Sequence, residues 1–206
     1  MWVVFAVFSM MLTDNNVGES SLNTSLLELA EQGHSYYSEK SSVDPSRMVI
    51  IDFSKPSSDK RLYVVDIVND RVLLETYVSH GKNSGNLMVK SVSNEVNSNQ
   101  SSQGFFKIAE KYVGKHGESY RLDGLEHGIN DNARKRAIVI HAAWYANEEI
   151  IEQQGRLGRS FGCPALPTDD YKKFQELVGP NALMFIYFPN EKYISSSPFI
   201  RSLSSS

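Results

Sequence analysis

A single cysteine, Cys163, is the side chain of this 206-residue protein best suited to covalent chemistry. It follows Gly162, where the lack of a side chain lets a substrate carbonyl approach the backbone. A thiol becomes a strong nucleophile when a neighbouring imidazole takes its proton. His141 ends the apolar run Ala137–His141, so a strand could hold it rigidly, 22 residues before the cysteine. The two residues together predict a thiol nucleophile with a histidine base.

Two ordinary alternatives compete with this prediction. A lone cysteine is often a small buried hydrophobic residue, and a histidine at a strand end is often hydrogen-bonded within a core. Ser160 offers a different nucleophile, because residues 158–162 match the G-x-S-x-G turn of serine hydrolases. In that fold the histidine follows the serine, whereas all five histidines of this chain precede Ser160. Cys163 therefore remains the better nucleophile.

The residues around Cys163 could also stabilise an oxyanion during acyl transfer. Backbone N–H groups aimed at such an oxygen form an oxyanion hole, and we expect Cys163 and its neighbours to supply them. Ser160 and Gly162 would support this loop, whereas Pro164 has no N–H to donate.

Metal binding is the other chemistry that these side chains permit. The four histidines 80, 116, 127 and 141 could in principle gather a zinc ion together with Cys163. The chain has neither an H-E-x-x-H nor a C-x-x-C motif, and scattered histidines are usually ordinary surface or core residues. We therefore expect no metal site.

The composition excludes several classes of protein. The net charge is −3 and the pI is about 6.0, whereas nucleic-acid binders are usually strongly basic. One cysteine rules out an internal disulfide framework. A mean hydropathy of −0.33 does not suit a membrane-embedded chain. The length fits one domain with a short appendage.

The N-terminus is apolar from Met1 to Leu12, interrupted only by Ser9. This run is shorter than the roughly 20 residues of a membrane-spanning helix but has the length of the apolar part of a secretory signal. It lacks a preceding basic residue and a clear cleavage site, so a buried strand or helix is the alternative. We expect residues 1–21 to be a signal remnant and linker, and the protein to be exported to the periplasm or cell envelope.

Seven segments have the composition of strands, and three have the pattern of helices. The predicted strands are 48–53, 60–68, 71–78, 104–113, 119–125, 137–141 and 182–188. Only Asn69-Asp70 separates the second strand from the third, which predicts a tight hairpin. The first predicted helix is Leu22–Gln32, which Gly33 would end. The second would begin after Asn147 as its N-cap and end at Gly155. The third would have Thr168 as its N-cap and end before Gly179-Pro180. The first belongs to an N-terminal helical appendage over 22–47, the catalytic domain spans 48–190, and 191–206 is a frayed tail.

Strands outnumber helices and do not alternate regularly with them. This order predicts a mainly β fold, with mixed or antiparallel sheets and a few short helices.

A polar segment interrupts the strands between residues 81 and 104. Six Ser, five Asn and three Gly occupy 14 of its 24 positions, so we expect it to bury little of itself. Long loops of this kind are more often functional than idle, although a mobile excursion is the alternative. His80 precedes the segment directly and could line a cleft, or it could be an ordinary turn histidine.

The sequence Ile140-His141, followed by Ser160-Phe161-Gly162-Cys163, resembles the catalytic domain of the YkuD-like L,D-transpeptidases. The chain is most similar to the divergent subgroup known as the murein L,D-transpeptidase catalytic domain family. The resemblance takes in most of residues 48–188, through RLYVVDI, VSHGKNSG, SNQSSQGFF, the segment from YVGKHGESYRLDGL to IVIHAAWY, and GRLGRSFGCPALP.

This resemblance implies a β-rich fold and peptidoglycan stem peptides as donor and acceptor. Cys163 would attack the bond after the third residue of the donor stem and release the terminal D-alanine. The acyl group would then pass to an amine of a neighbouring stem, with His141 as general base and later as acid. The resemblance implies that the reaction needs no metal and no organic cofactor. It also implies that the protein associates peripherally with the envelope and that carbapenem-type β-lactams inhibit it covalently.

The chain departs from the family pattern near both predicted catalytic residues. Ala142 replaces a frequent glycine, Phe161 replaces a second histidine, and Pro164-Ala165 stands where many members have an arginine. We expect Arg159 or Arg156 to supply the missing charge to the carboxylate of the stem. These departures leave two alternatives to transpeptidation, an L,D-carboxypeptidase at the same site and a cell-wall-binding module without turnover. The sequence does not indicate an oligomeric state.

Overall fold

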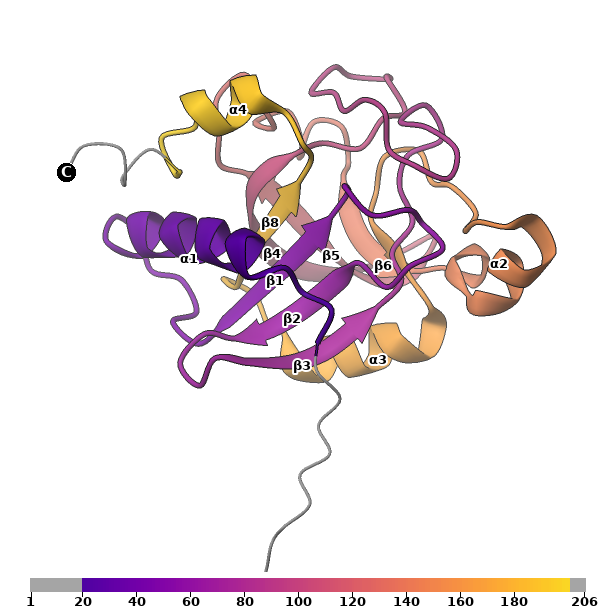
Figure 1. The fold of residues 1–206 in the computed structure, drawn as a ribbon, viewed down its shortest axis with the longest axis horizontal. Coiled ribbons are helices and arrows are strands. Elements are labelled where there is room, and N and C mark those ends of the chain that lie inside the picture. The colour runs from indigo at the N-terminus through magenta and orange to yellow at the C-terminus, as the bar shows by residue number, and fades with distance from the viewer. Residues whose placement is uncertain (1–19, 201–206) are drawn as a thin grey trace, which may run out of the picture.

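The structure, a computed structural model, describes residues 20–200 (Figure 1). Within that range eight strands form one mixed sheet in the order β3-β2-β1-β8-β4-β5-β6-β7, so the predicted mainly β class is confirmed. The strands are β1 (Arg47–Asp52), β2 (Leu62–Asp66), β3 (Arg71–Thr76), β4 (Gly104–Gly114), β5 (Gly117–Gly124), β6 (Val139–Ala142), β7 (Ala165–Leu166) and β8 (Leu183–Tyr187). The helices are α1 (Thr24–Ser38), η1 (Trp144–Ala146), α2 (Glu148–Gln154), α3 (Thr168–Leu177) and α4 (Glu191–Ser196).

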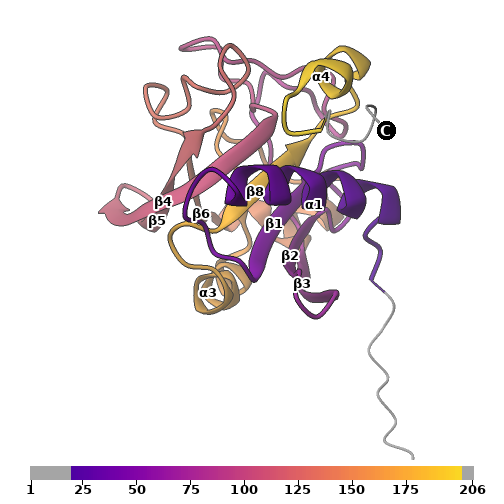
Figure 2. The same cartoon turned by 90° about the vertical axis from the view of Figure 1, so that its left-hand side faces the viewer.

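The central strand β1 is buried on both of its faces. It pairs antiparallel with β2 and parallel with β8. Val49 and Ile51 point into one hydrophobic cluster, whereas Met48 and Ile50 point into a second one. Residues of α3 belong to the first cluster and residues of α1 and α4 to the second, so helices cover both faces (Figure 2). A strand enclosed in this way reads as an unbroken apolar run.

Two antiparallel hairpins flank the centre of the sheet. The predicted β2–β3 hairpin is confirmed, with a turn in which Asp70 has a φ of 47°. The second hairpin, β4–β5, is longer and turns at Lys115 and His116. Gly117 follows this turn with a φ of 76°, a conformation that glycine adopts without strain. The two strands stay paired up to Gly114 and Gly117, so the hairpin extends beyond the part of β4 that pairs with β8.

Helix α1 is longer than the sequence predicts. It begins after Asn23, whose side chain accepts a hydrogen bond from the N–H of Leu26, and it continues through Gly33. The prediction that Gly33 ends the helix is wrong, because this glycine packs against Phe105. A Cβ atom there would lie only 2.0 Å from the Phe105 ring. Tertiary packing therefore fixes a glycine inside the helix, and the helix shares the core of the strands.

The two helices after β6 follow the sequence more closely. Helix α2 ends at Gly155, which has a φ of 71°, as predicted. Asn147 precedes α2, but its side chain makes no capping hydrogen bond. Helix α3 starts at Thr168 itself, with Pro167 in the capping position, so the prediction of Thr168 as the cap is wrong by one residue.

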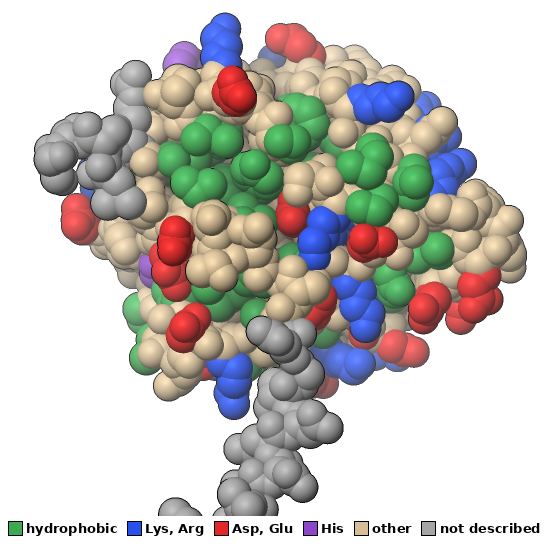
Figure 3. All heavy atoms as spheres, in the orientation of Figure 1, with side chains coloured by type: hydrophobic (Ala, Val, Ile, Leu, Met, Phe, Trp, Pro, Cys, Tyr) green, Lys and Arg blue, Asp and Glu red, His purple; other side chains and the backbone are tan. Residues whose placement is uncertain are grey.

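The segment after β8 is packed, so the prediction of a frayed tail is wrong for residues 191–200. Helix α4 buries Tyr193, and Phe199 stacks on Phe105 with ring centroids 4.9 Å apart. The Tyr193 hydroxyl donates a hydrogen bond of 2.8 Å to Glu126. Apolar side chains gather on the face between α1 and α4 (Figure 3), where a groove of about 510 Å³ is found.

The polar segment 81–104 is more buried than its composition predicts. Ser84, Ser101 and Ser102 are each no more than 2% exposed, because they bond to backbone groups within the domain. The prediction that this segment buries little of itself is wrong. The signal predicted in residues 1–12 lies outside the described residues. No helix between residues 20 and 200 is both long and apolar enough to cross a membrane.

Candidate active site

Cys163 and His141 line the same pocket, which has a volume of about 290 Å³. Its walls come from the tip of the β4–β5 hairpin, from the start of β6 and from the loop before β7. The lining residues are Tyr112, Lys115, His116, Arg136, Ala137, Val139, His141, Tyr145, Arg159, Ser160, Phe161 and Cys163. The structure therefore brings the two predicted catalytic residues to one cavity, although 21 residues separate them in the chain.

Backbone pairing explains why these residues meet. His141 lies in β6, opposite Ser119 of β5 and beside Ala165 of β7. The N–H of His141 donates a hydrogen bond of 3.3 Å to the carbonyl of Pro164, the residue directly after Cys163. The short parallel strand β7 thus fixes the loop that carries the thiol against the strand that carries the imidazole.

The His141 ring is buried and held in one orientation. Only 1% of the residue is exposed, and Nδ1 lies 2.8 Å from the backbone carbonyl of Ala142. A carbonyl only accepts hydrogen bonds, so Nδ1 carries the hydrogen and Nε2 keeps its lone pair. Burial lowers the pKa of His141 to about 4, and the charges of His116 and Lys115 act in the same direction. His141 is therefore neutral at pH 7, the form that accepts a proton.

Cys163 is a free and partly buried thiol. Its Sγ donates to the carbonyl of Ala137 at 3.8 Å, and no hydrogen bond between Sγ and His141 occurs among the described residues. Burial raises the pKa of the Cys163 thiol, although the N–H of Val139 and the positive charges of Lys115 and Arg136 oppose this rise. The structure is thus a resting state with a neutral thiol and a neutral imidazole.

Ser160 clamps the loop that carries Cys163. Its Oγ donates to the carbonyl of Cys163 at 2.6 Å and accepts from the N–H of Gly162 at 3.0 Å. Its backbone is tied to the chain at His80 and Lys82, by hydrogen bonds of 2.9 and 2.8 Å. The Gly162 N–H is occupied by Ser160, which leaves the N–H of Cys163 as the candidate oxyanion donor of this loop.

Gly162 is required by its backbone conformation and by its surroundings. Its φ is +128°, which side chains rarely tolerate, and a Cβ atom would lie 2.7 Å from the carbonyl oxygen of Gln100. The Gly162 carbonyl accepts a hydrogen bond of 3.3 Å from the Ser101 hydroxyl. The polar segment 81–104 therefore forms a wall directly behind the Cys163 loop.

His80 does not line the pocket. It is fully buried, its Nδ1 lies 2.9 Å from a guanidinium nitrogen of Arg61, and its Nε2 lies 3.3 Å from the carbonyl of Gly85. Burial and the neighbouring Arg61 charge lower the pKa of His80 to about 4. Its contact with the site runs through its backbone carbonyl, which accepts from the N–H of Ser160. His80 supports the Cys163 loop from behind.

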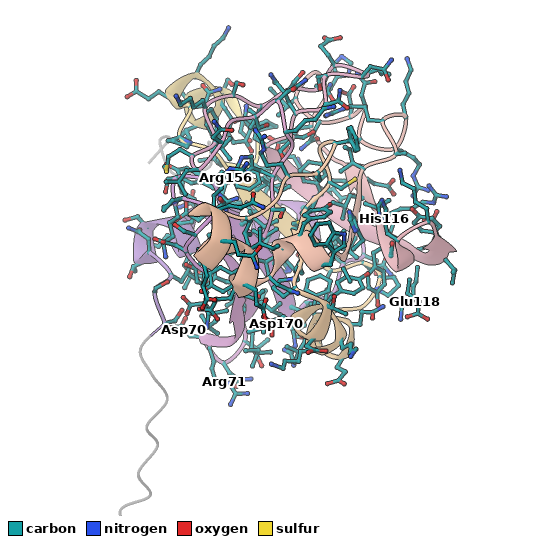
Figure 4. All side chains as sticks on the ribbon, turned by 90° about the vertical axis from the view of Figure 1, so that its right-hand side faces the viewer. Asp70, Arg71, His116, Glu118, Arg156 and Asp170 are labelled. Carbon is teal, nitrogen blue, oxygen red and sulfur yellow. The ribbon has the colours of Figure 1, made fainter. Side chains whose placement is uncertain are left out.

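The two arginines expected to bind a carboxylate lie in different places. Arg159 lines the pocket, and its Nη1 donates to the carbonyls of Lys82 and Gly85 and to the side chain of Asn86. Arg156 is not a lining residue and donates to the carbonyl of Leu157 at 2.7 Å. Figure 4 shows Arg156 well separated from His116, which marks the side of the pocket.

Lys115, His116 and Arg136 line the pocket but were not among the catalytic or substrate-binding residues expected from the sequence, where His116 was considered only as a zinc ligand. The His116 ring stacks on His141 with ring centroids 4.1 Å apart, and Lys115 precedes it in the same turn. Arg136 donates to the carbonyls of Ser93 and Gln100 and to the hydroxyls of Ser98 and Ser102. The only available signal was the pair Lys115-His116 between two predicted strands, because a turn there brings both side chains to one end of a hairpin.

The structure also tests the residues for metal binding. In the part of the chain from residue 20 to residue 200, no three His, Cys, Asp or Glu side chains are grouped so that they could hold a metal ion. His127, one of the four histidines considered for zinc, is exposed and pairs with Asp131 at 2.9 Å.

Several solved structures resemble this fold. They include an L,D-transpeptidase from Mycobacterium smegmatis (14% identity, 69% of this chain, TM-score 0.44), one from Mycobacterium tuberculosis H37Rv (12%, 70%, 0.45) and one from Stackebrandtia nassauensis (16%, 79%, 0.44). The matches take in 59%, 58% and 65% of those chains, so this chain spans less than two thirds of their length. No curated protein gives a match.

The chain also matches a known protein family. Residues 18–187 match the family described as the L,D-transpeptidase catalytic domain, and this range includes every strand of the sheet and all the lining residues of the pocket. Because the match takes in most of the 206 residues, the chain belongs to the L,D-transpeptidase catalytic domain family.

Proposed function

We propose that this protein is a peptidoglycan L,D-transpeptidase that acts through an acyl-enzyme on Cys163. The observation that carries the proposal is the shared pocket of Cys163 and His141, in which the Ala142 carbonyl fixes the imidazole tautomer. Membership of the L,D-transpeptidase catalytic domain family supports the reaction class. Stem peptides are the donor and acceptor in this proposal, and no cofactor takes part.

In the first half of the proposed reaction, Cys163 attacks a carbonyl of the donor stem. Nε2 of His141 takes the proton of the thiol while Sγ forms a bond to the carbonyl carbon. The tetrahedral intermediate then breaks its bond to the terminal D-alanine, whose nitrogen receives the proton from His141. The low pKa of His141 favours this return of the proton, because the imidazolium is a strong acid in its buried position.

In the second half, an amine of the acceptor stem attacks the thioester. His141 takes a proton from this amine, and the departing thiolate of Cys163 is reprotonated from His141 as the new amide bond forms. Water in place of the amine would turn the same site into an L,D-carboxypeptidase. The backbone N–H of Cys163 is the proposed oxyanion donor, because the Gly162 N–H is bonded to Ser160.

The decisive experiment incubates the purified protein with tetrapeptide muropeptides and identifies the products by mass spectrometry. Cross-linked dimers are expected, whereas tripeptides without dimers would indicate the carboxypeptidase. Binding without any product would indicate a wall-binding module. The matched control is Cys163→Ala, which removes only the sulfur atom. Product formation by this variant would refute Cys163 as the nucleophile.

A peptidoglycan substrate implies that the enzyme works in the periplasm or cell envelope. The apolar run of residues 1–12 supports export in this proposal. Fractionation of cells that express the full chain tests it, with the cytoplasmic fraction as the contradicting outcome.

A further inference from the structure

The pocket around Cys163 is positively charged, although the whole chain is acidic. Lys115, Arg136 and Arg159 line it, and no Asp or Glu is among the lining residues, whereas the net charge of the chain is −3. Cations that converge on a cleft raise the local concentration of anions. This local reversal of charge points to a ligand that carries a negative group.

The three cations are not equally free to bind such a group. Arg136 directs both of its terminal nitrogens at backbone carbonyls and serine hydroxyls of the polar segment 81–104. Arg159 directs Nη1 at the chain between Lys82 and Asn86. Lys115 is exposed, and its ammonium makes no hydrogen bond or ion pair within residues 20–200. Of the three cations, Lys115 is therefore the one whose charged group has no hydrogen-bond partner within residues 20–200, whereas Arg136 is engaged through both terminal nitrogens and Arg159 through Nη1.

Lys115 also influences both predicted catalytic groups electrostatically. Its positive charge lowers the pKa of His141 and opposes the rise in the pKa of Cys163. The neighbouring His116 holds the turn in place by stacking on His141, with ring centroids 4.1 Å apart. Lys115 is thus an exposed lining residue of the pocket, on a turn that is anchored to the site.

We propose that Lys115 binds the carboxylate of the donor, the terminal carboxylate of the stem peptide next to the bond that Cys163 attacks. This inference rests on the proposed function for the identity of the donor, but the anion-binding role of Lys115 is testable without a peptide. The tip of the β4–β5 hairpin then selects donors that carry a free carboxylate. Amidated donors lack the partner of Lys115.

Two alkylating reagents of similar size test the anion-binding role. Iodoacetate is an anion and iodoacetamide is neutral, and both transfer their carbon to the Cys163 sulfur with release of iodide. At pH 8 and low salt, Lys115→Ala is expected to lower the iodoacetate rate about fivefold relative to the iodoacetamide rate. Lys115→Arg keeps the charge and should preserve the ratio, and 0.5 M salt should narrow the difference between the wild type and Lys115→Ala.

Lys111→Ala is the matched control on the same hairpin. It removes the same charge from β4, but Lys111 pairs with Glu118 at 3.5 Å and does not line the pocket. Its ratio of the two rates should equal that of the wild type. Equal effects of Lys115→Ala on both reagents, or an equal effect of Lys111→Ala on the ratio, would overturn the proposal.

Tetrapeptide donors with a free or an amidated terminal carboxylate provide the second test. Lys115→Ala should raise KM about tenfold for the free carboxylate and leave KM for the amidated donor unchanged. Any change in kcat comes from the lost charge near His141 and Cys163 and should be the same for both donors. A KM for the free carboxylate that does not move would exclude this donor as the ligand of Lys115. If the wild type makes no product from either donor while the iodoacetate effect persists, the proposed function fails and the anion-binding role stands.

Discussion

The imidazole rings of His116 and His141 are stacked, with centroids 4.1 Å apart and an angle of 18° between their planes. One ring comes from the turn of a surface hairpin and the other from a buried strand. The stack covers one face of His141 and places a second titratable group beside the proposed base. It couples the geometry of the hairpin tip to the basicity of His141.

Removal of the His116 ring should raise the pKa of His141. In His116→Ala, water gains access to the buried imidazole and a like charge is lost, and both changes favour the protonated form. Because a protonated His141 cannot act as a base, the acid limb of the kcat/KM profile should move to higher pH by roughly one unit. The measurement is a pH–rate profile with muropeptide donors between pH 4 and pH 9.

His116→Phe separates stacking from charge. It keeps an aromatic ring over His141 and should shift the acid limb less than His116→Ala. His127→Ala removes an exposed histidine outside the pocket and should leave the profile unchanged. An acid limb that stays in place in His116→Ala would show that the stack does not tune the base.

Gly162→Ala should destabilise the fold by about 3 kcal/mol and abolish turnover. The backbone at this position has a φ of +128°, and the new methyl group would meet the Gln100 carbonyl at 2.7 Å. Urea unfolding measures the change in free energy. Gly128→Ala is the control, because its φ is +75° but the space around it is open, and it should cost only about 1 kcal/mol. Equal losses in the two variants would contradict the close contact.

Arg136→Lys should loosen the polar segment behind the Cys163 loop. Lysine keeps the charge but cannot reproduce the forked hydrogen bonds to the carbonyls of Ser93 and Gln100, so we expect a loss of about 2 kcal/mol. Hydrogen exchange of the amides between residues 93 and 102 should accelerate. Arg134→Lys is the control, because this exposed arginine makes its forked hydrogen bonds to Glu110 and Asp123 and none to residues 93–102, so the exchange of those amides should not change. Unchanged exchange in Arg136→Lys would refute the clamp.

The free energy of unfolding should fall as the pH drops from about 6.5 to about 4. His80 and His141 each have a pKa of about 4 in the folded protein, against roughly 6.5 when unfolded. The unfolded chain therefore binds more protons in this window, and stability rises with pH until it levels off above 6.5. Each residue contributes about 3 kcal/mol over the window.

His80→Gln tests the share of one buried histidine. Glutamine can accept from Arg61 and donate to the Gly85 carbonyl without titrating, so the loss of stability between pH 6.5 and pH 4 should be about half as steep. His127→Gln should retain the full slope. The same steepness in His80→Gln and the wild type would mean that the pKa of His80 is the same in the folded and the unfolded protein.

Local sequence patterns determined much of this protein. The buried strand 48–53 was readable because an enclosed strand needs apolar residues at successive positions, and the β2–β3 hairpin was readable from its turn. The end of α2 at Gly155 could likewise be predicted from the local sequence. The proposed nucleophile and base followed from residue type and from a family resemblance, because Cys163 and His141 lie in short recognisable segments.

Tertiary structure decided what lies around these two residues. The Phe105 ring fixes Gly33 inside α1, and packing of Phe199 orders a segment that looked like a tail. Lys115, His116 and Arg136 belong to the pocket because β5 pairs with β6 and a long hairpin folds over it, which no local pattern encodes. Residue type and near neighbours set which groups can react, whereas contacts between distant segments set the charge, burial and water access that control their pKa values.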